Sequence, residues 1–214
     1  MRRYALIAGI SAVFLTLCDQ LFHVRTETLV YHWDPQIAGQ TILVPLTFLL
    51  ASASMLDTSR RVHAIQPRST STFGVIASLA IVAAAYLISG FVDQGFAPAY
   101  ALLLLAAWAF RVVRRGEQGA AVVAAALIAT GGVLGEAALS AIGEFSYLQP
   151  DLLGVPWWLF PLYLHGAMAA RDMCAAAQMP RISPPSTGSI VPVMKLDAGD
   201  SRNAAALPNS DGRP

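Results

Sequence analysis

Long apolar runs recur along the chain and leave few folds open to it. A hydrocarbon core about 30 Å thick is crossed by about 20 mostly apolar helical residues, because each residue rises about 1.5 Å. The stretches that meet this requirement are 4–22, 40–56, 73–92, 96–113, 120–142 and 156–170. The sequence therefore predicts an all-α integral membrane protein, a six-transmembrane-helix bundle within residues 1–178.

The composition agrees with a membrane protein. Hydrophobic residues make up 56% of the chain and charged residues 13%, whereas a soluble domain carries about 25% charged residues. A net charge of +1 provides no basic surface for nucleic acid. The first run follows Arg2 and Arg3 and so resembles a signal peptide, but the bulky Leu17 disfavours cleavage. We expect this run to remain as a permanent span.

The arginines predict the orientation of the bundle, because Lys and Arg are retained on the cytoplasmic side. Apart from Arg25, they fall at the N-terminus, in every second connection or after the last run, and include Arg2, Arg3, Arg60, Arg61, Arg68, Arg111, Arg114, Arg115, Arg171 and Arg181. We therefore expect a multi-pass protein of the cell membrane with both termini in the cytoplasm. Residues 179–214 are polar and interrupted by prolines, which predicts a disordered cytoplasmic tail.

Glu136 is the most informative single residue. It lies within the run 120–142, roughly 7–8 Å from the expected midplane of the membrane. An ionisable side chain at that depth is a functional-site candidate unless it is hydrogen-bonded across to another helix. Both a ligand contact and a purely structural role are open for Glu136.

Small residues surround Glu136 on its helix. At helical spacing its own face carries Ala129, Gly132, Ser140 and Gly143, which leaves space in front of the carboxyl group. The neighbouring stripe of Gly131 and Gly135, with Ala121, Ala125 and Ala129, is typical of close helix contact. We expect helix 120–142 to be central in the bundle.

Other polar groups are predicted to lie inside the bundle or at its rim. Tyr86 and Ser89 could offer hydroxyls to a cavity or bond their own helix backbone. His165 is either satisfied by a carbonyl group or part of a proton relay. Asp19 and His23 close the first run, either as a solvated helix end or as part of a site.

Motifs for metal binding, cofactor binding and catalysis are absent from the sequence. It has no helix-spaced His or Cys pair, no glycine-rich phosphate loop and no nucleophile elbow. We expect neither a metal nor a cofactor, and no enzymatic activity.

Two of the predicted outer loops echo each other. Tyr31, Pro35 and Gly39 precede the second run, and Tyr147, Pro150 and Gly154 precede the sixth. A common loop–proline–helix junction and an internal duplication both account for this pattern.

The same loops resemble those of the Insig (insulin-induced gene) family. The resemblance rests on Gly143-Glu144-Phe145-Ser146-Tyr147-Leu148-Gln149-Pro150-Asp151-Leu152-Leu153, Trp158-Leu159 and Gly166, and on Asp19-Gln20, His23-Val24, Leu29-Val30-Tyr31, Pro35, Gly39-Gln40 and Val44-Pro45-Leu46. Glu136 stands at or near a position where that family has a polar amide.

The resemblance implies a non-enzymatic bacterial membrane protein that binds a sterol or diacylglycerol-like lipid in an intramembrane cavity, as a lipid sensor. A homo-oligomer in the lipid bilayer is expected through the small-residue faces. The candidate ligand-binding residues are Glu136, Gly132, Gly131, Gly135, Ala129, Ser140, Tyr86, Ser89 and His165. The alternative is a small proton-coupled transporter or intramembrane enzyme that uses Glu136, with His165 as a possible partner.

Overall fold

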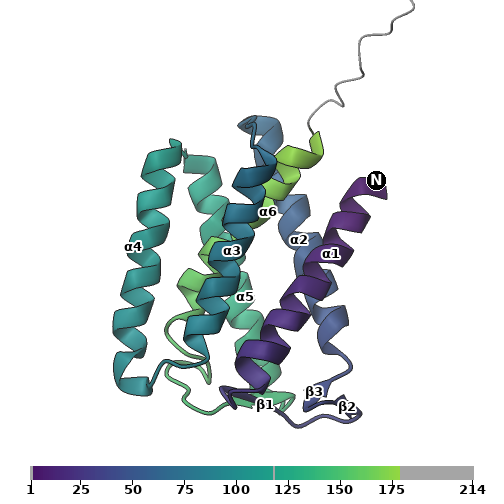
Figure 1. Cartoon of the computed structure of the whole chain (residues 1–214), viewed down its shortest axis with the longest axis vertical. Helices are drawn as coiled ribbons and strands as arrows, with labels where there is room; N and C mark the ends of the chain where they lie inside the picture. Colours follow the sequence, from purple (N-terminus) through teal and green to yellow (C-terminus); the bar gives the residue numbers. More distant parts are fainter. Residues whose placement is uncertain (1, 118, 179–214) are drawn as a thin grey trace, which may run out of the picture. The chain divides into compact units, whose positions relative to one another are not determined.

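The computed structural model describes residues 2–117 and 119–178, and the predicted tail, 179–214, lies outside the described residues. Six α-helices dominate this part of the chain (Figure 1). They are α1 Arg2–Asp19, α2 Val44–Ile65, α3 Thr72–Ser89, α4 Ala97–Arg115, α5 Gly119–Ala141 and α6 Leu159–Gln178. The predicted all-α fold class is confirmed.

Short strands gather at one end of the helices. Strand β1 (Leu29–Tyr31) pairs antiparallel with β4 (Phe145–Tyr147), and β2 (Gln36–Ile37) pairs with β3 (Gln40–Thr41). The β1–β4 ladder joins the two loops whose sequences echo each other. We call this the strand end of the bundle, at the bottom of Figure 1.

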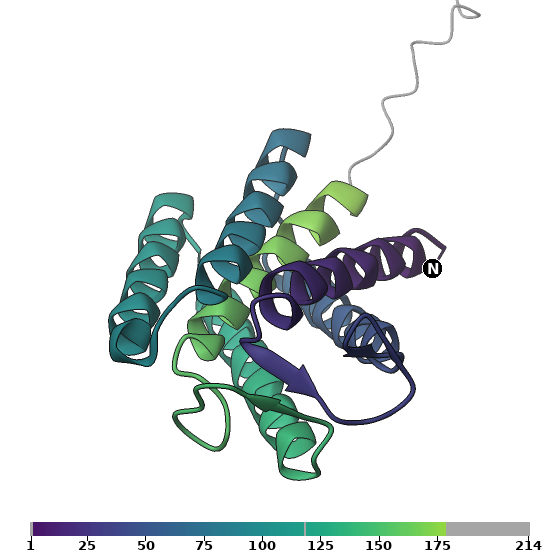
Figure 2. The same cartoon turned by 60° about the horizontal axis from the view of Figure 1, so that its bottom comes forward.

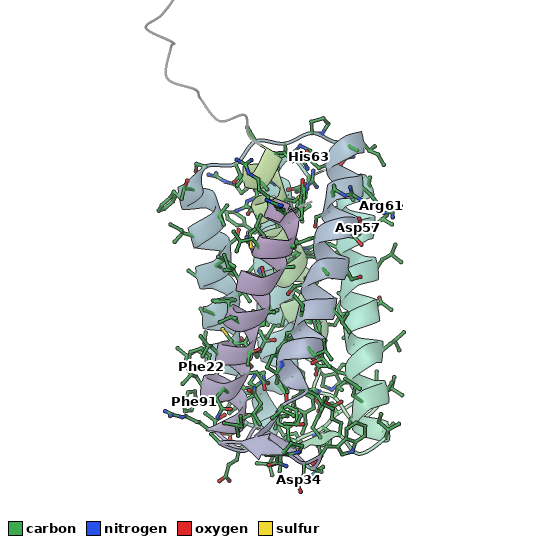
Figure 3. The ribbon with its side chains drawn as sticks, turned by 90° about the vertical axis from the view of Figure 1, so that its right-hand side faces the viewer. Phe22, Asp34, Asp57, Arg61, His63 and Phe91 are labelled. Carbon is green, nitrogen blue, oxygen red and sulfur yellow. The ribbon has the colours of Figure 1, made fainter. Side chains whose placement is uncertain are left out.

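The opposite end holds the connections between α2 and α3 and between α4 and α5 (Figure 1). Figure 3 shows Asp34 at the strand end and His63 at this opposite end. Since it also gathers several arginine side chains described below, we call it the arginine end.

Within the described residues, four helices are long and apolar enough to cross a membrane. They span Arg2–Val24, Thr72–Ser89, Gln94–Arg115 and Gly119–Ala141, the first because α1 continues through a π-helical turn, η1 (Gln20–Val24), and the third because the 3₁₀ turn η2 (Gln94–Phe96) precedes α4. The protein is therefore a membrane protein. Helices α2 and α6 carry charged residues in their C-terminal halves, Asp57, Arg60 and Arg61 in α2 and Arg171 and Asp172 in α6.

The predicted bounds of two helices are wrong. We predicted 40–56 and 156–170, but α2 runs over Val44–Ile65 and α6 over Leu159–Gln178. A helix predicted from hydropathy stops at the first charged residue. In the structure, the charged residues of these two helices have partners. Asp57 pairs with Arg60 and Arg61 within α2, so the helix continues past the apolar run.

The central helix is α6, contrary to the expectation for helix 120–142. Most of the α6 side chains are buried, whereas α5 buries only Ala121, Ala125 and Ala129. Viewed with the strand end forward, α6 lies among α3, α5, α2 and α1 (Figure 2). The reason is that α6 contacts helices on several sides, while α5 presents one narrow stripe to it.

That stripe confirms one part of the prediction and corrects another. Ala125 and Ala129 pack against Leu164 and Ala167 of α6, as expected for close helix contact. The Gly131 and Gly135 stripe makes no such contact, because a Cβ atom at either glycine would meet no atom within 4 Å. These two glycines border open space.

Candidate functional site

A cavity of about 500 Å³ lies between α2 and α5. A volume of that size is within the range of small-molecule sites, roughly 300–1,000 Å³. One wall is the α2 face with Val44, Thr47, Phe48, Ala51, Ser54, Met55 and Thr58, and the other is the α5 face with Leu127, Ile128, Gly131, Gly132, Gly135, Glu136 and Leu139. Between the walls, Tyr86 of α3 and Leu159 and Tyr163 of α6 also line the cavity.

Glu136 lines this cavity and already has two protein partners. The hydroxyl of Tyr147 donates a hydrogen bond to one carboxylate oxygen, and the hydroxyl of Tyr163 donates to the other. These contacts join α5 to β4 and α6. Glu136 therefore links elements of the fold, and it also faces the cavity.

The three glycines of α5 that line the cavity contribute in two ways. Gly131 and Gly135 leave their part of the wall flat and open. Gly132 is different, because a Cβ atom there would lie 2.8 Å from the ring of Tyr163. Gly132 thus allows Tyr163 to lie against the helix and reach Glu136, while the other two glycines leave room for a ligand.

Four predicted site residues lie elsewhere. Ala129 is fully buried against α6, and Ser140 lies beside Gly154. Ser89 donates to the Tyr86 carbonyl oxygen at 2.9 Å and shares a hydrogen bond with His23. None of the three lines the cavity, because each is used in local packing.

His165 is the fourth. Its Nδ1 atom lies 2.7 Å from Nη1 of Arg111, and its Nε2 atom lies 3.0 Å from the Leu104 carbonyl oxygen. His165 is fully buried and does not line the cavity that contains Glu136. The structure therefore does not bring these two residues together as a proton pair.

Tyr86 is the predicted residue with an open polar group. Its side chain is only 4% exposed and lines the cavity, yet its hydroxyl has no hydrogen-bond partner among residues 2–117 and 119–178. Its ring packs against His23, with centroids 4.9 Å apart. The Tyr86 hydroxyl is thus free to contact a ligand.

Asp19 and Tyr31 complete the strand end of the cavity. Tyr31 donates a hydrogen bond to Asp19 at 2.9 Å, and the Gln40 amide donates to the same carboxylate oxygen at 2.7 Å. Burial, together with the neighbouring Asp19, raises the pKa of Tyr31. The phenol therefore keeps its proton and acts as the donor.

The Asp19–Tyr31 pair matches the Glu136–Tyr147 pair, since each tyrosine of the two echoing loops donates to a carboxylate on the helix before it. The two tyrosines also lie on neighbouring paired strands. The repeated loop sequence could have identified the two tyrosines, but it gave no indication of the carboxylates that accept from them.

Sequence reasoning also missed Glu144 and the α2 wall. Glu144 follows α5, lines the cavity and is only 2% exposed. Burial raises the pKa of Glu144. The small and polar α2 residues recur at helical spacing, with Thr47, Ala51, Ser54 and Thr58 on one face. That pattern was the available signal.

The arginine end holds a second polar cluster, away from the cavity. Asp172 of α6 accepts hydrogen bonds from Ser78 of α3 at 2.5 Å and from Arg115 of α4 at 2.8 Å. Glu117 pairs with Arg68 and with Arg171. Arginines that indicated only orientation in the sequence therefore hold helices together.

No family model and no curated protein matches the chain. Among solved structures, MvINS from Mycobacterium vanbaalenii, a mycobacterial Insig homologue, aligns with a TM-score of 0.73 and 26% sequence identity. A cross-linked MvINS trimer aligns with a TM-score of 0.73 and 27% identity. Each alignment covers 85% of this chain and 97% of the MvINS chain.

Proposed function

We propose that this Insig-like membrane protein binds a sterol or diacylglycerol-like lipid in the cavity between α2 and α5 and acts as a non-enzymatic lipid sensor. The observation that carries the proposal is a cavity of about 500 Å³ with apolar walls, open glycines and polar groups. An amphiphile needs that combination, because its tail requires apolar contact and its head requires a few hydrogen bonds.

In this proposal the lipid head group forms its hydrogen bond with Tyr86 in preference to Glu136. Both carboxylate oxygens of Glu136 accept from tyrosines, whereas the Tyr86 hydroxyl lacks a partner in the described part of the chain. A phenol hydroxyl can both donate and accept a hydrogen bond. A lipid hydroxyl or ester group in the cavity would give the Tyr86 hydroxyl a partner.

The Gly135→Leu variant tests the placement of the lipid. Leucine would extend into the open space beside α5, so we expect co-purified lipid to fall on the order of tenfold, while folding is kept. Native mass spectrometry of protein extracted in a gentle detergent measures the bound lipid. Gly9→Leu is the matched control, since Gly9 is also helical, has open space around it and does not line the cavity. Equal lipid in both variants would contradict the placement.

The Glu136→Gln variant separates a lipid-binding protein from a proton-coupled transporter or intramembrane enzyme. Glutamine can still accept from one tyrosine and donate to the other. We expect bound lipid to change no more than about threefold. A transporter or enzyme that uses this carboxyl would instead lose flux or turnover. Native mass spectrometry and a proton-flux assay in liposomes, on the same protein, decide between them.

The assembly and orientation belong to the same proposal. The cross-linked trimer of MvINS supports a homo-oligomer for this chain. We keep the predicted cell-membrane location with both termini in the cytoplasm, supported by the gathering of arginines at one end of the bundle. Cysteine labelling of intact cells at Asp34 and Arg61, which Figure 3 shows at opposite ends, would test the orientation.

A further inference from the structure

The polar groups of the cavity have an unbalanced charge. Three carboxylates line it, those of Asp19, Glu136 and Glu144, and the one basic side chain on its described walls is His23. Lys and Arg do not contribute to the described lining. A charged group away from water is stable only when it is paired, hydrogen-bonded or neutralised, so each carboxyl group needs a partner if it is to carry its charge.

Two of the three carboxylates find their partners inside the protein. Asp19 accepts from Tyr31 and Gln40, and its other oxygen lies 3.5 Å from Nδ1 of His23. Glu136 accepts from its two tyrosines, as described above. These two groups therefore do not require a ligand.

Glu144 has no such partner. No side chain or backbone group in the described parts of the chain donates a hydrogen bond to its carboxylate or pairs with it, although the residue is only 2% exposed. It also follows the C-terminus of α5, where the helix dipole is negative and disfavours another negative charge. The unpaired carboxylate faces the same cavity as the open hydroxyl of Tyr86.

We propose that the cavity prefers an amphiphile with a protonated amine, whose ammonium group pairs with Glu144 and lies within reach of the polar groups at the strand end. This inference rests on the proposed lipid cavity and adds the charge of the head group. The ammonium supplies both the positive charge and the hydrogen-bond donors that Glu144 lacks. An anionic head group would meet three carboxyl groups and is disfavoured relative to the amine.

The experiment compares three ligands that share one chain, namely oleylamine, oleyl alcohol and oleic acid. Each displaces a fluorescent lipid from the purified full-length protein in the same detergent. We expect oleylamine to bind more tightly than oleyl alcohol by about tenfold or more, and oleic acid to bind most weakly. The wild-type protein alone can overturn the inference: oleyl alcohol or oleic acid binding as tightly as oleylamine would do so.

The Glu144→Gln variant assigns the preference to one residue. It is nearly the same size, and we expect it to bind oleylamine and oleyl alcohol equally. Glu27→Gln makes the same chemical change at an exposed residue outside the cavity and should keep the preference. An amine preference that survives in Glu144→Gln overturns the role of Glu144.

The two proposals fail in different ways. Displacement by oleyl alcohol without an amine preference would remove the inference on the head group and leave the lipid cavity intact. Displacement by none of the three ligands, together with no co-purified lipid, would count against both.

Discussion

Replacing Asp172 by alanine is expected to destabilise the bundle by about 3 kcal/mol, because it removes a fully buried carboxylate from the partly buried Arg115 and Arg68. Asp172 is fully buried, accepts from Ser78 and Arg115, and lies 3.5 Å from Arg68. Without Asp172, Glu117 is the one carboxylate among the described residues of the polar cluster at the arginine end.

Thermal unfolding in detergent, followed by tryptophan fluorescence, measures this loss. Asp57→Ala is the control, since Asp57 pairs with Arg60 and Arg61 on an exposed surface and such pairs contribute little. Asp57 and Arg61 are labelled in Figure 3. If both variants melted at the same temperature, the arginine-end cluster would not stabilise the fold.

Replacing Gly90 by alanine is expected to cost more than about 3 kcal/mol, because the new methyl group would overlap main-chain atoms that cannot turn aside. A Cβ atom at Gly90 would collide with the carbonyl oxygen of Phe22 and lie 3.0 Å from Oγ1 of Thr26. Thr26 itself donates to that carbonyl at 2.7 Å. Gly90 is therefore the residue that lets the end of α3 touch η1.

Figure 3 shows Phe22 and Phe91, the neighbour of Gly90, near each other at the strand end. The matched control is Gly95→Ala, at a nearby glycine with no atom within 4 Å of the added carbon. Thermal unfolding should show a large loss for Gly90→Ala and almost none for Gly95→Ala. A small loss in both would mean that α1 and α3 separate easily at this end.

Much of the fold could be predicted from apolar runs and their spacing. These features identify the helices because burial in a membrane demands long uncharged helices. They failed in the C-terminal halves of α2 and α6, where charged residues lie within a helix, because hydropathy cannot show that Asp57 or Arg171 has a partner. The sequence also predicted α5 as the central helix instead of α6. Small residues indicate close contact on one face of a helix only, so they do not show how many neighbours the helix has.

The candidate site was predicted in part. Glu136, its neighbouring glycines and Tyr86 were identified because a polar or missing side chain inside an apolar run is visible locally. Glu144 and Tyr163 were not identified. Each looks ordinary in its own segment, because Tyr163 gains its role from its hydrogen bond to Glu136 and Glu144 gains its role from the cavity that it lines.

The sequence by itself determined that this chain enters a membrane as helices, since hydrocarbon admits no other solution for runs of this length. It also placed an ionisable group and open glycines on one helix. Only the tertiary structure decided that two tyrosines satisfy Glu136 while Glu144 remains unpaired. The physical reason is that a hydrogen bond depends on distances across the bundle, and no local pattern in the chain encodes those distances.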